Sequence, residues 1–291
     1  MAELSLIEAK EKNCVKTKIL DDYEVDWIKE LRKWSYNYTS VQIYKVKAES
    51  DFYLLKSVKS LNDEHIEDIQ KLHKLYQEYE KKSNHLLKTL KTEEEEGNIE
   101  ILYECSDKDL NSICKDSKDV TRRMKEILEP LTLFEEQKIP HLELKPNNIF
   151  IVDGITKIVY LVNPLASQSI KERTDIYLPP EVNGNKEFDP SKVDVYSWGR
   201  TFDELLSAEI KDKNYLAMLK ELEGRELWVE EALEKALCDS PEERASFKDL
   251  KAAISDSTVG QGSLKINKEK YERKIKKLEK NIEKMEKDKG T

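Results

Sequence analysis

The chain has 291 residues, of which 38% are hydrophobic and 37% charged, and its formal net charge is −9. That length allows one globular domain with a substantial core and a short extension, and the acidic balance argues against nucleic acid or acidic membranes as partners of the main surface. Four scattered cysteines, a charged N-terminus and the lack of a long apolar run argue against a zinc site, a disulfide framework, a signal peptide and a membrane span, so we expect a cytoplasmic or nuclear protein.

The N-terminal segment over residues 1–31 is highly charged. Val25, Ile28 and Leu31 recur within it at helical spacing. We therefore predict a charged, loosely helical extension that precedes the globular domain.

The region 32–106 predicts a small lobe of strands with one inserted helix. Segments rich in β-branched and aromatic residues predict strands, and apolar residues on one face after Asn62, a suitable N-cap, predict the helix. Acidic residues next to Gly97 indicate a solvated turn between the last two strands. The expected strands cover 41–46, 52–58, 85–90 and 99–104, and the expected helix covers 62–82.

The region 107–257 predicts a larger, mostly helical lobe, interrupted by a short hairpin around Asp153 and Gly154. A small β-rich lobe followed by an α-helical one belongs to the α+β class. The expected helices of the second half cover 195–206, 215–223, 229–238 and 246–254.

The tail over 258–291 has a different pattern. After a linker-like stretch, four apolar residues recur every seven positions among Lys and Glu, which is typical of a coiled-coil helix. The open alternatives for this basic tail are homodimerisation, pairing with the chain's own acidic body, binding to another protein or an anionic surface, and a solvated single helix. The repeat consists of Leu264, Tyr271, Leu278 and Met285.

The most informative motif is HLELKPNNIF, residues 141–150. It resembles the protein-kinase catalytic loop H-R-D-L-x-x-x-N, in which the Asp is the catalytic base and the Asn binds magnesium. His141 and Asn148 stand at matching places, whereas Leu142 replaces the Arg and Glu143 replaces the Asp. The extra methylene of Glu143 displaces its oxygens by about 1 Å, which catalysis by positioning tolerates poorly.

Other residues resemble the structural framework of the kinase family, from about residue 38 to 254. Glu181 in TDIYLPPEV matches the acid of the A-P-E segment, and Arg244 matches its buried ion-pair partner. Asp194 in KVDVYSWG matches the Asp that hydrogen-bonds the catalytic-loop backbone. The resemblance implies a bilobal kinase-like fold in which His141 and these three residues have structural roles.

The nucleotide-binding elements of the family are matched less well. Lys56 resembles the lysine that grips the phosphates, and Val41 stands where the family's valine covers the adenine. The places of the glycine-rich loop hold larger residues, which cannot give the backbone the same close approach to phosphate. These residues are Trp34, Tyr36 and Thr39.

If a nucleotide binds, the resemblance implies a defined set of contacts. His73 falls where the family's helix carries the glutamate partner of the lysine, and Glu67 and Glu78 are alternatives in a shifted register. Tyr103 would guard the back of the adenine pocket. The nucleotide-contacting set is Val41, Lys56, Tyr103, Glu104, Cys105 and Asn148.

Magnesium is not expected at this site. The place of the metal-binding aspartate in the D-F-G motif holds Asn163, and a neutral amide cannot offset divalent charge as a carboxylate does. Asn148 alone makes a poor metal site. No cofactor is required under this interpretation, and binding of ATP stays open.

Together, these residues resemble a pseudokinase that acts as a scaffold or allosteric regulator through protein contacts, with an active kinase among the candidate partners. No catalytic residue is expected to function, because Glu143 and Asn163 occupy degenerate positions. The alternative is a weak or atypical ATP-dependent Ser/Thr kinase, or a nucleotide binder without catalysis.

Overall fold

The chain divides into two units, Met1–Ser255 and Asp256–Thr291. The predicted helix over 215–223, the degenerate position Asn163 and the predicted coiled coil lie outside the described residues. The computed structural model describes residues 17–36, 38–113, 117–160, 176–183, 188–210 and 227–259.

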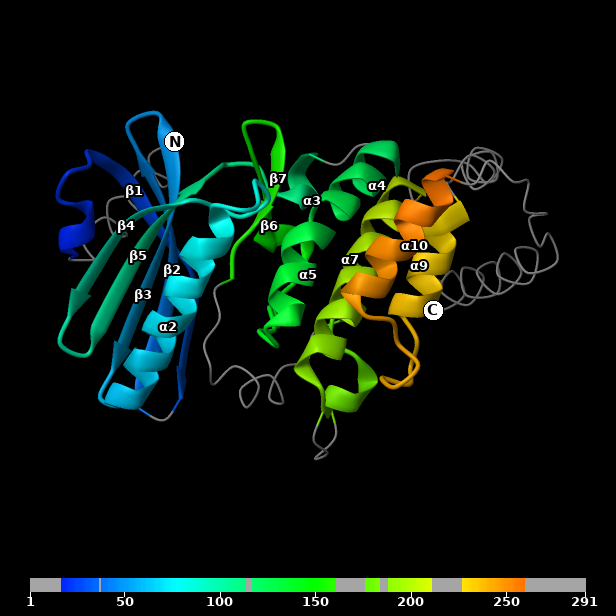
Figure 1. Ribbon diagram of the computed structural model, residues 1–291. Coiled ribbons are helices and arrows are strands. Elements are labelled where there is room, and N and C mark those ends of the chain that lie inside the picture. The colour runs from blue at the N-terminus through cyan, green and yellow to red at the C-terminus, as the bar shows by residue number, and fades with distance from the viewer. Residues whose placement is uncertain are drawn as a thin grey trace, which may run out of the picture. The chain divides into compact units, whose positions relative to one another are not determined.

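One five-stranded antiparallel sheet forms the small lobe (Figure 1). Its strand order is β1-β2-β3-β5-β4, so β1 and β4 are the two edge strands. The predicted strands over 41–46, 52–58 and 99–104 are confirmed by β2, β3 and β5. The strands are β1 Val25–Tyr36, β2 Thr39–Ala48, β3 Asp51–Ser60, β4 Thr89–Glu95 and β5 Asn98–Cys105.

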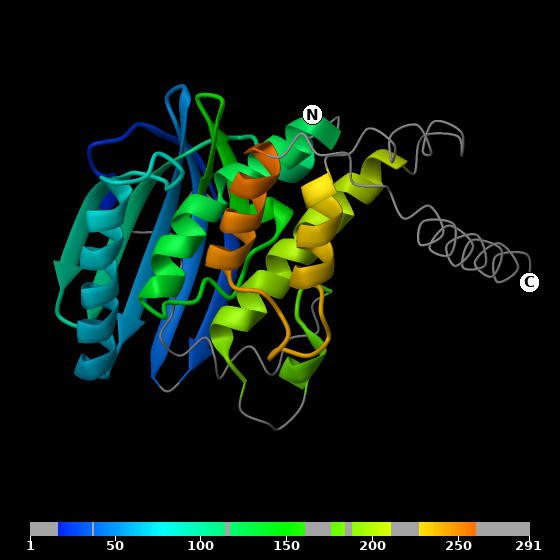
Figure 2. The ribbon, with the colours of Figure 1, turned by 45° about the vertical axis from the view of Figure 1, so that its right-hand side comes forward.

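The helix of the small lobe, α2 (Asp63–Glu80), begins where the sequence predicted. Asn62 is its N-cap, and the side-chain oxygen accepts a hydrogen bond from the backbone N–H of Glu64 at 3.0 Å. The helix lies against one face of the sheet (Figure 1 and Figure 2) and buries Ile69 and Tyr76 in the core.

The two faces of the sheet enter different hydrophobic clusters. The face beside α2, called the inner face below, includes Ile43 and Ile101, and its cluster continues into the helical lobe. The opposite, outer face includes Tyr44 and Leu102, together with residues of the 3-10 helix η1 (Lys18–Leu20). Adjacent strand residues point to opposite faces, and the neighbours Ile43 and Tyr44 accordingly belong to separate clusters.

Within the described residues, the prediction of a helix that reaches residue 31 is wrong. Val25, Ile28 and Leu31 lie in β1, so the small lobe begins before residue 32. In a regular strand, apolar side chains alternate between the two faces, with a period of two. This alternation is interrupted twice in β1, because the β1–β2 register shifts after Val25 and again after Glu30, and the apolar residues are therefore spaced as in a helix.

The strand expected over 85–90 is also displaced, since β4 begins at Thr89. The preceding residues pair with the other lobe instead. The N–H of Leu87 donates to the carbonyl of Ile158, and the N–H of Ile158 donates to the carbonyl of His85, each at 3.0 Å. The segment is extended, but its partner strand belongs to the helical lobe, which sequence spacing does not reveal.

The helical lobe places the catalytic-loop motif between α5 and a short hairpin. Asp153 and Gly154 both have positive φ, 51° and 79°, as a two-residue hairpin turn requires. The predicted helices over 195–206, 229–238 and 246–254 are confirmed. The elements are α3 Leu110–Ile113, α4 Ser117–Glu126, α5 Leu128–Glu136, η2 Pro146–Asn148, β6 Ile149–Val152, β7 Ile155–Ile158, η4 Pro180–Asn183, α7 Pro190–Ile210, α9 Leu227–Ala236 and α10 Phe247–Val259.

Close packing in this lobe depends on one glycine. A Cβ atom on Gly199 of α7 would come within 2.9 Å of the Cβ of Ala236 on α9. Only a residue without a side chain allows the two helices to approach so closely. Within the described ranges, no helix combines the length and the apolar character needed to span a membrane.

Candidate active site

An arginine from the small lobe occupies the centre of the catalytic-loop motif. Arg32 on β1 forms an ion pair through Nη1 with the carboxylate of Glu143, and its Nη2 donates to Oδ1 of Asn148 at 2.7 Å. The side chains of Arg32 and Glu143 are 20% and 15% exposed, so solvent and salt screen their attraction only partly. We call this three-residue contact the Arg32 latch.

The latch engages both ends of the Asn148 side chain. The amide Nδ2 donates to the carbonyl of Glu143 at 2.5 Å, while Oδ1 accepts from Arg32, and Asn148 is buried. A guanidinium group stays protonated in proteins. One permanent cation therefore contacts both the carboxylate at the base position and the amide oxygen at the metal position.

A buried acid holds the backbone of the catalytic loop. Asp194 on α7 accepts hydrogen bonds from the backbone N–H groups of His141 and Leu142, the latter at 2.6 Å. Leu142 has a φ of 59°, which is strained for a bulky side chain and must be held by its surroundings. Burial raises the pKa of Asp194 to about 7, although the two hydrogen bonds favour the charged form.

The residue in the place of the kinase arginine is an apolar anchor. The side chain of Leu142 is buried in a cluster with Val182 and Val193, next to Leu178 and Phe188. Such packing offers no charge to a phosphorylated segment, because it contains only hydrocarbon and an aromatic ring. This cluster instead joins the loop to the segment before α7.

His141 is buried and neutral. Burial, with the positive charge of Arg32 as a second cause, lowers the pKa of His141 to about 3. Its ring packs edge-on against Tyr160, with 4.9 Å between the ring centroids. His141 is thus placed as a packing residue rather than as a proton donor at neutral pH.

Lys56 on β3 faces a histidine of α2. Burial lowers the pKa of Lys56 to about 8, and burial together with the charge of Lys56 lowers the pKa of His73 to about 4. The Nε2 atom of His73 shares a hydrogen bond with Oγ1 of Thr92 at 2.9 Å. Glu67 and Glu78 are exposed on α2, so the alternative of a shifted register is wrong and His73 takes the place of the glutamate.

The cavity beside Lys56 is small. Its volume of about 20 Å³ accommodates about one water molecule, whereas pockets for organic ligands measure about 300–1,000 Å³. Val41 and Tyr103 are buried on the inner face of the sheet nearby. The lining includes Lys56, His73, Tyr76, Tyr103, Phe134 and Tyr160.

Glu104, one of the residues expected to form the nucleotide hinge, ties the two lobes together. Glu104 accepts a hydrogen bond from the backbone N–H of Lys88 at 2.9 Å and forms an ion pair with Lys157 of β7. Burial raises the pKa of the neighbouring Cys105 to about 11. The side chain of Glu104 is therefore committed to contacts within the protein.

The framework of the helical lobe contains a bidentate ion pair. Arg244 donates through Nη1 to Oε1 of Glu181 at 2.6 Å and through Nη2 to Oε2 at 3.2 Å. The same guanidinium donates to the carbonyls of Cys238 at 3.0 Å and Lys192 at 2.8 Å. Its side chain is completely buried, and every contact is of the charge-assisted kind.

Comparison with known families identifies the family to which this fold belongs. Residues 37–253, most of the chain, match the family described as "Protein kinase domain". The chain belongs to the protein kinase domain family. The predicted α+β, bilobal kinase fold is thereby confirmed. The strand that carries Arg32 precedes the part of the kinase domain that matches.

Two curated relatives resemble parts of this kinase domain. The Wee1-like protein kinase of Arabidopsis thaliana is 28% identical over 137 residues, which cover 44% of this chain and 27% of that protein. The Wee1-like protein kinase of Oryza sativa subsp. japonica is 31% identical over 86 residues, which cover 28% and 16% respectively. The chain thus spans about a quarter or less of the length of these relatives.

Arg32 is the residue of this kinase site that sequence reasoning missed. The segment that ends at residue 31 was expected to be helical, and a single arginine directly after this charged stretch carries no specific signal. A usable hint was present in the catalytic loop, where Glu143 is one methylene longer than the family's aspartate and therefore reaches further across the cleft. In the described part of the kinase domain, no group of three or more His, Cys, Asp or Glu side chains is arranged to hold a metal ion.

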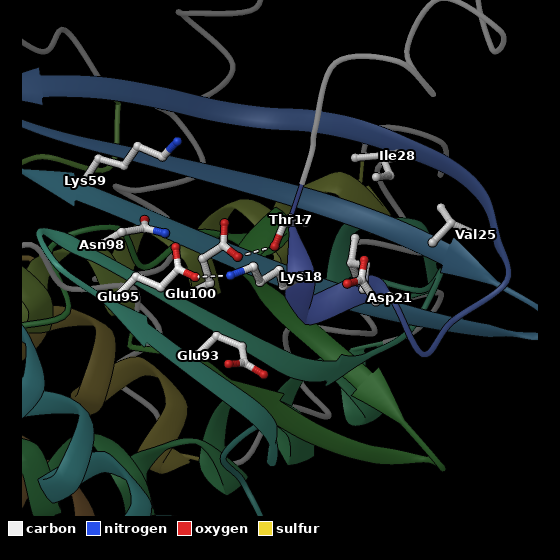
Figure 3. A pocket seen from close by; sticks show the side chains of 11 residues that line it. Thr17, Lys18, Asp21, Val25, Ile28, Lys59, Glu93, Glu95, Asn98 and Glu100 are labelled. Carbon is white, nitrogen blue, oxygen red and sulfur yellow. Dashed lines mark hydrogen bonds and ion pairs between the residues drawn. The ribbon is translucent and has the colours of Figure 1, made fainter.

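A larger hollow, of about 690 Å³, lies on the outer face of the sheet (Figure 3). Several of its charged side chains form contacts with one another or with neighbours. Lys18 pairs with Glu95 at 2.6 Å, and Glu100 accepts hydrogen bonds from Thr17 and Ser57. None of the site residues predicted from the sequence is among those that line it.

Proposed function

We propose that this member of the protein kinase family is catalytically inactive and acts by binding other proteins, as a scaffold or as an allosteric regulator. The observation that carries the proposal is the Arg32 latch. A single guanidinium binds the carboxylate of Glu143 and the amide oxygen of Asn148.

The latch opposes both requirements of phosphoryl transfer. The reaction depends on metal ions that neutralise charge on the transferred group. It also depends on a carboxylate base that receives the proton of the substrate hydroxyl. A metal ion and Arg32 cannot both use Oδ1 of Asn148, because two cations would repel each other at that oxygen. Glu143 likewise contacts a cation of the small lobe, where an active enzyme would present its base to substrate.

The lysine side of the cleft supports the same proposal. Active protein kinases require an ion pair between this lysine and a glutamate on the small-lobe helix. Here Lys56 faces His73, whose pKa of about 4 leaves it neutral at physiological pH. A neutral imidazole cannot replace the electrostatic support of a carboxylate.

The proposal requires no cofactor. It includes protein partners, with an active kinase and a second copy of this chain as candidates, in the cytoplasm or nucleus. The relatives' names favour the competing function, a weak Ser/Thr protein kinase that would use Lys56, Glu143 and Asn148. Phosphate transfer by the purified chain distinguishes the two.

A transfer assay with radiolabelled ATP and a protein substrate tests the catalytic part. We expect wild-type protein to incorporate no more phosphate than the Lys56→Met and Glu143→Gln variants, with Mg²⁺ or with Mn²⁺. Incorporation by wild type that both substitutions abolish would establish the enzyme and refute the proposal.

Light scattering tests whether the tail joins two copies. We expect the full chain to have the mass of a dimer and a chain ending at Val259, the last residue of α10, to have the mass of a monomer. Heptad positions occupied by Leu264 and Leu278 provide the apolar contact. Equal oligomeric states would remove the homodimer from the proposal.

A further inference from the structure

The alternation of side chains between the two faces of the sheet is broken in β1 at Leu31. Glu30 opposes Tyr44 on the outer face, and two residues later Arg32 opposes Ile43 on the inner face. Two steps along β1 therefore match one step along β2. This is a β-bulge with Leu31 as the extra residue, and bulges re-aim the side chains that follow them.

The bulge decides which way Arg32 points. In an unbroken ladder Arg32 would oppose Gln42 and share the outer face with Glu30. On that face the Nε2 of Gln42 donates to Oε2 of Glu30 at 2.9 Å. With the bulge, Arg32 stands in one inner-face row with Ile43 and Lys56, from which it reaches the catalytic loop.

We propose that β1 is a register switch that opens and closes this cleft. In the observed register the latch is closed. A slip by one residue removes the bulge, places Leu31 opposite Ile43 and transfers Arg32 to the outer face. The slip releases Glu143 and Asn148. It also turns over the β1 residues that follow, so that Lys33 comes to oppose Val41 on the inner face.

Three features make the second register accessible. β1 is an edge strand, so only its ladder with β2 has to re-form. Leu31 is 42% exposed in the closed register, and burying it on the inner face is favourable. Tyr38 has a φ of 64°, which suits the last residue of a three-residue hairpin loop, the loop that the slipped register requires.

The closed register is favoured by the charge-assisted contacts of Arg32 and by the exposed position of Lys33, and the open register by burial of Leu31. A partner that binds the outer face of β1 or the released catalytic loop would shift the balance toward the open register. This register switch acts on the same cleft as the proposed function. It rests on that proposal in one respect, namely that Arg32 occupies the cleft.

Acetylation of Lys56 reports the state of the cleft. Lys56 is 4% exposed, and its neighbour on the same strand, Lys59, is exposed and serves as an internal reference. The protein is treated with a water-soluble N-hydroxysuccinimide ester of acetic acid at pH 8, and each site is quantified by mass spectrometry. The lowered pKa of Lys56 leaves much of its amine reactive at that pH whenever the reagent reaches it.

Two variants act in opposite directions. Arg32→Ala removes the latch and raises the rate of Lys56 acetylation roughly tenfold, because local opening limits the reaction. Leu31→Asp makes the slipped register unfavourable, since a carboxylate would face Ile43, and slows the reaction below the wild-type rate. Lys29→Ala is the matched control and leaves the rate unchanged, because Lys29 is exposed and, lying before the bulge, opposes Lys45 in both registers.

A deletion of Leu31 tests the bulge itself. It joins Arg32 directly to Glu30, which gives a regular ladder with Arg32 still facing inward, and it should slow acetylation as Leu31→Asp does. If the deletion prevents folding, Leu31→Asp still decides, because that side chain is exposed. Acetylation of Lys56 at the wild-type rate or faster in Leu31→Asp overturns the switch. Phosphate transfer is a separate readout, so the switch and the proposed inactivity can fail independently.

Discussion

Two contacts between an arginine and a glutamate occupy different regions of the molecule. Arg244 is completely buried in the helical lobe, bidentate to Glu181 and further bound to two backbone carbonyls. Arg32 projects from an edge strand and remains 20% exposed, and it divides its donors between Glu143 and an amide. The first contact fixes the fold, whereas the second fills the place where a kinase does chemistry.

The difference shows which of the two ionic contacts is harder to rearrange. A fully buried arginine such as Arg244 cannot lose its glutamate without leaving an unpaired charge in the protein interior. A contact at the cleft can be rearranged at lower cost, because water reaches its rim. The framework residues match the family's motifs, whereas the cleft differs from them at Glu143.

The largest expected effect is at the framework pair. Arg244→Ala should lower the free energy of unfolding by about 3–5 kcal/mol, because the carboxylate of Glu181 and the carbonyls of Cys238 and Lys192 all lose their donor. Urea denaturation followed by circular dichroism measures the change. Arg200→Ala is the matched control, since Arg200 and Asp203 form a half-exposed pair worth about 1 kcal/mol or less. Equal losses for the two arginines would remove the distinction between framework and surface.

The second prediction concerns the pH dependence contributed by His73. Its pKa of about 4 in the folded protein lies below its ordinary value of 6.5, so between these values the unfolded chain binds more protons than the folded one. The stability that follows from neutral His73 is present above pH 6.5 and is lost as the pH falls through about 4. The loss amounts to about 2–3 kcal/mol.

His73→Leu should therefore flatten the decline of unfolding free energy between pH 6.5 and 4. Chemical denaturation at several pH values measures that slope. Thr92→Val breaks the same hydrogen bond but keeps the imidazole, and it should retain the wild-type slope. A slope that is unchanged in His73→Leu would show that His73 titrates normally and that the cleft does not disfavour its charged form.

The framework was predictable because its residues follow motifs of fixed local spacing. Asp194 was identified from KVDVYSWG, and the structure places it under the backbone N–H groups of His141 and Leu142. Glu181 and Arg244, which are far apart in the sequence, were matched by their surrounding motifs and meet in the structure. A motif carries such information because the family's packing determines its spacing.

The cleft was predictable only in part. The replacement of Asp by Glu143 was visible in the sequence, but the residue that it contacts was not. Arg32 reaches the loop because of one bulge, and a bulge depends on the pairing of two strands rather than on the local sequence. The same irregularity made the spacing of Val25, Ile28 and Leu31 look helical.

The smallest expected effect sharpens the comparison at Lys56. Burial lowers its pKa to about 8 from an ordinary 10.5, so between these values the folded protein binds fewer protons, and wild-type stability rises with pH. Lys56→Met removes the buried cation and should raise the free energy of unfolding at pH 7 by about 1–2 kcal/mol. The gain should shrink as the pH approaches 10.5.

Thermal and urea denaturation at pH 7 and pH 10 measure this gain, with Lys59→Met on the same strand as the control that changes stability by about 0.5 kcal/mol or less. A stabilising substitution at Lys56 means that the cleft keeps a cation at a cost to the fold, in contrast to Arg244, whose removal only destabilises. Destabilisation by Lys56→Met at pH 7 would instead place Lys56 among the framework residues. The two regions would then follow one rule, and the cleft would be held together by its charges in the same way as the helical lobe.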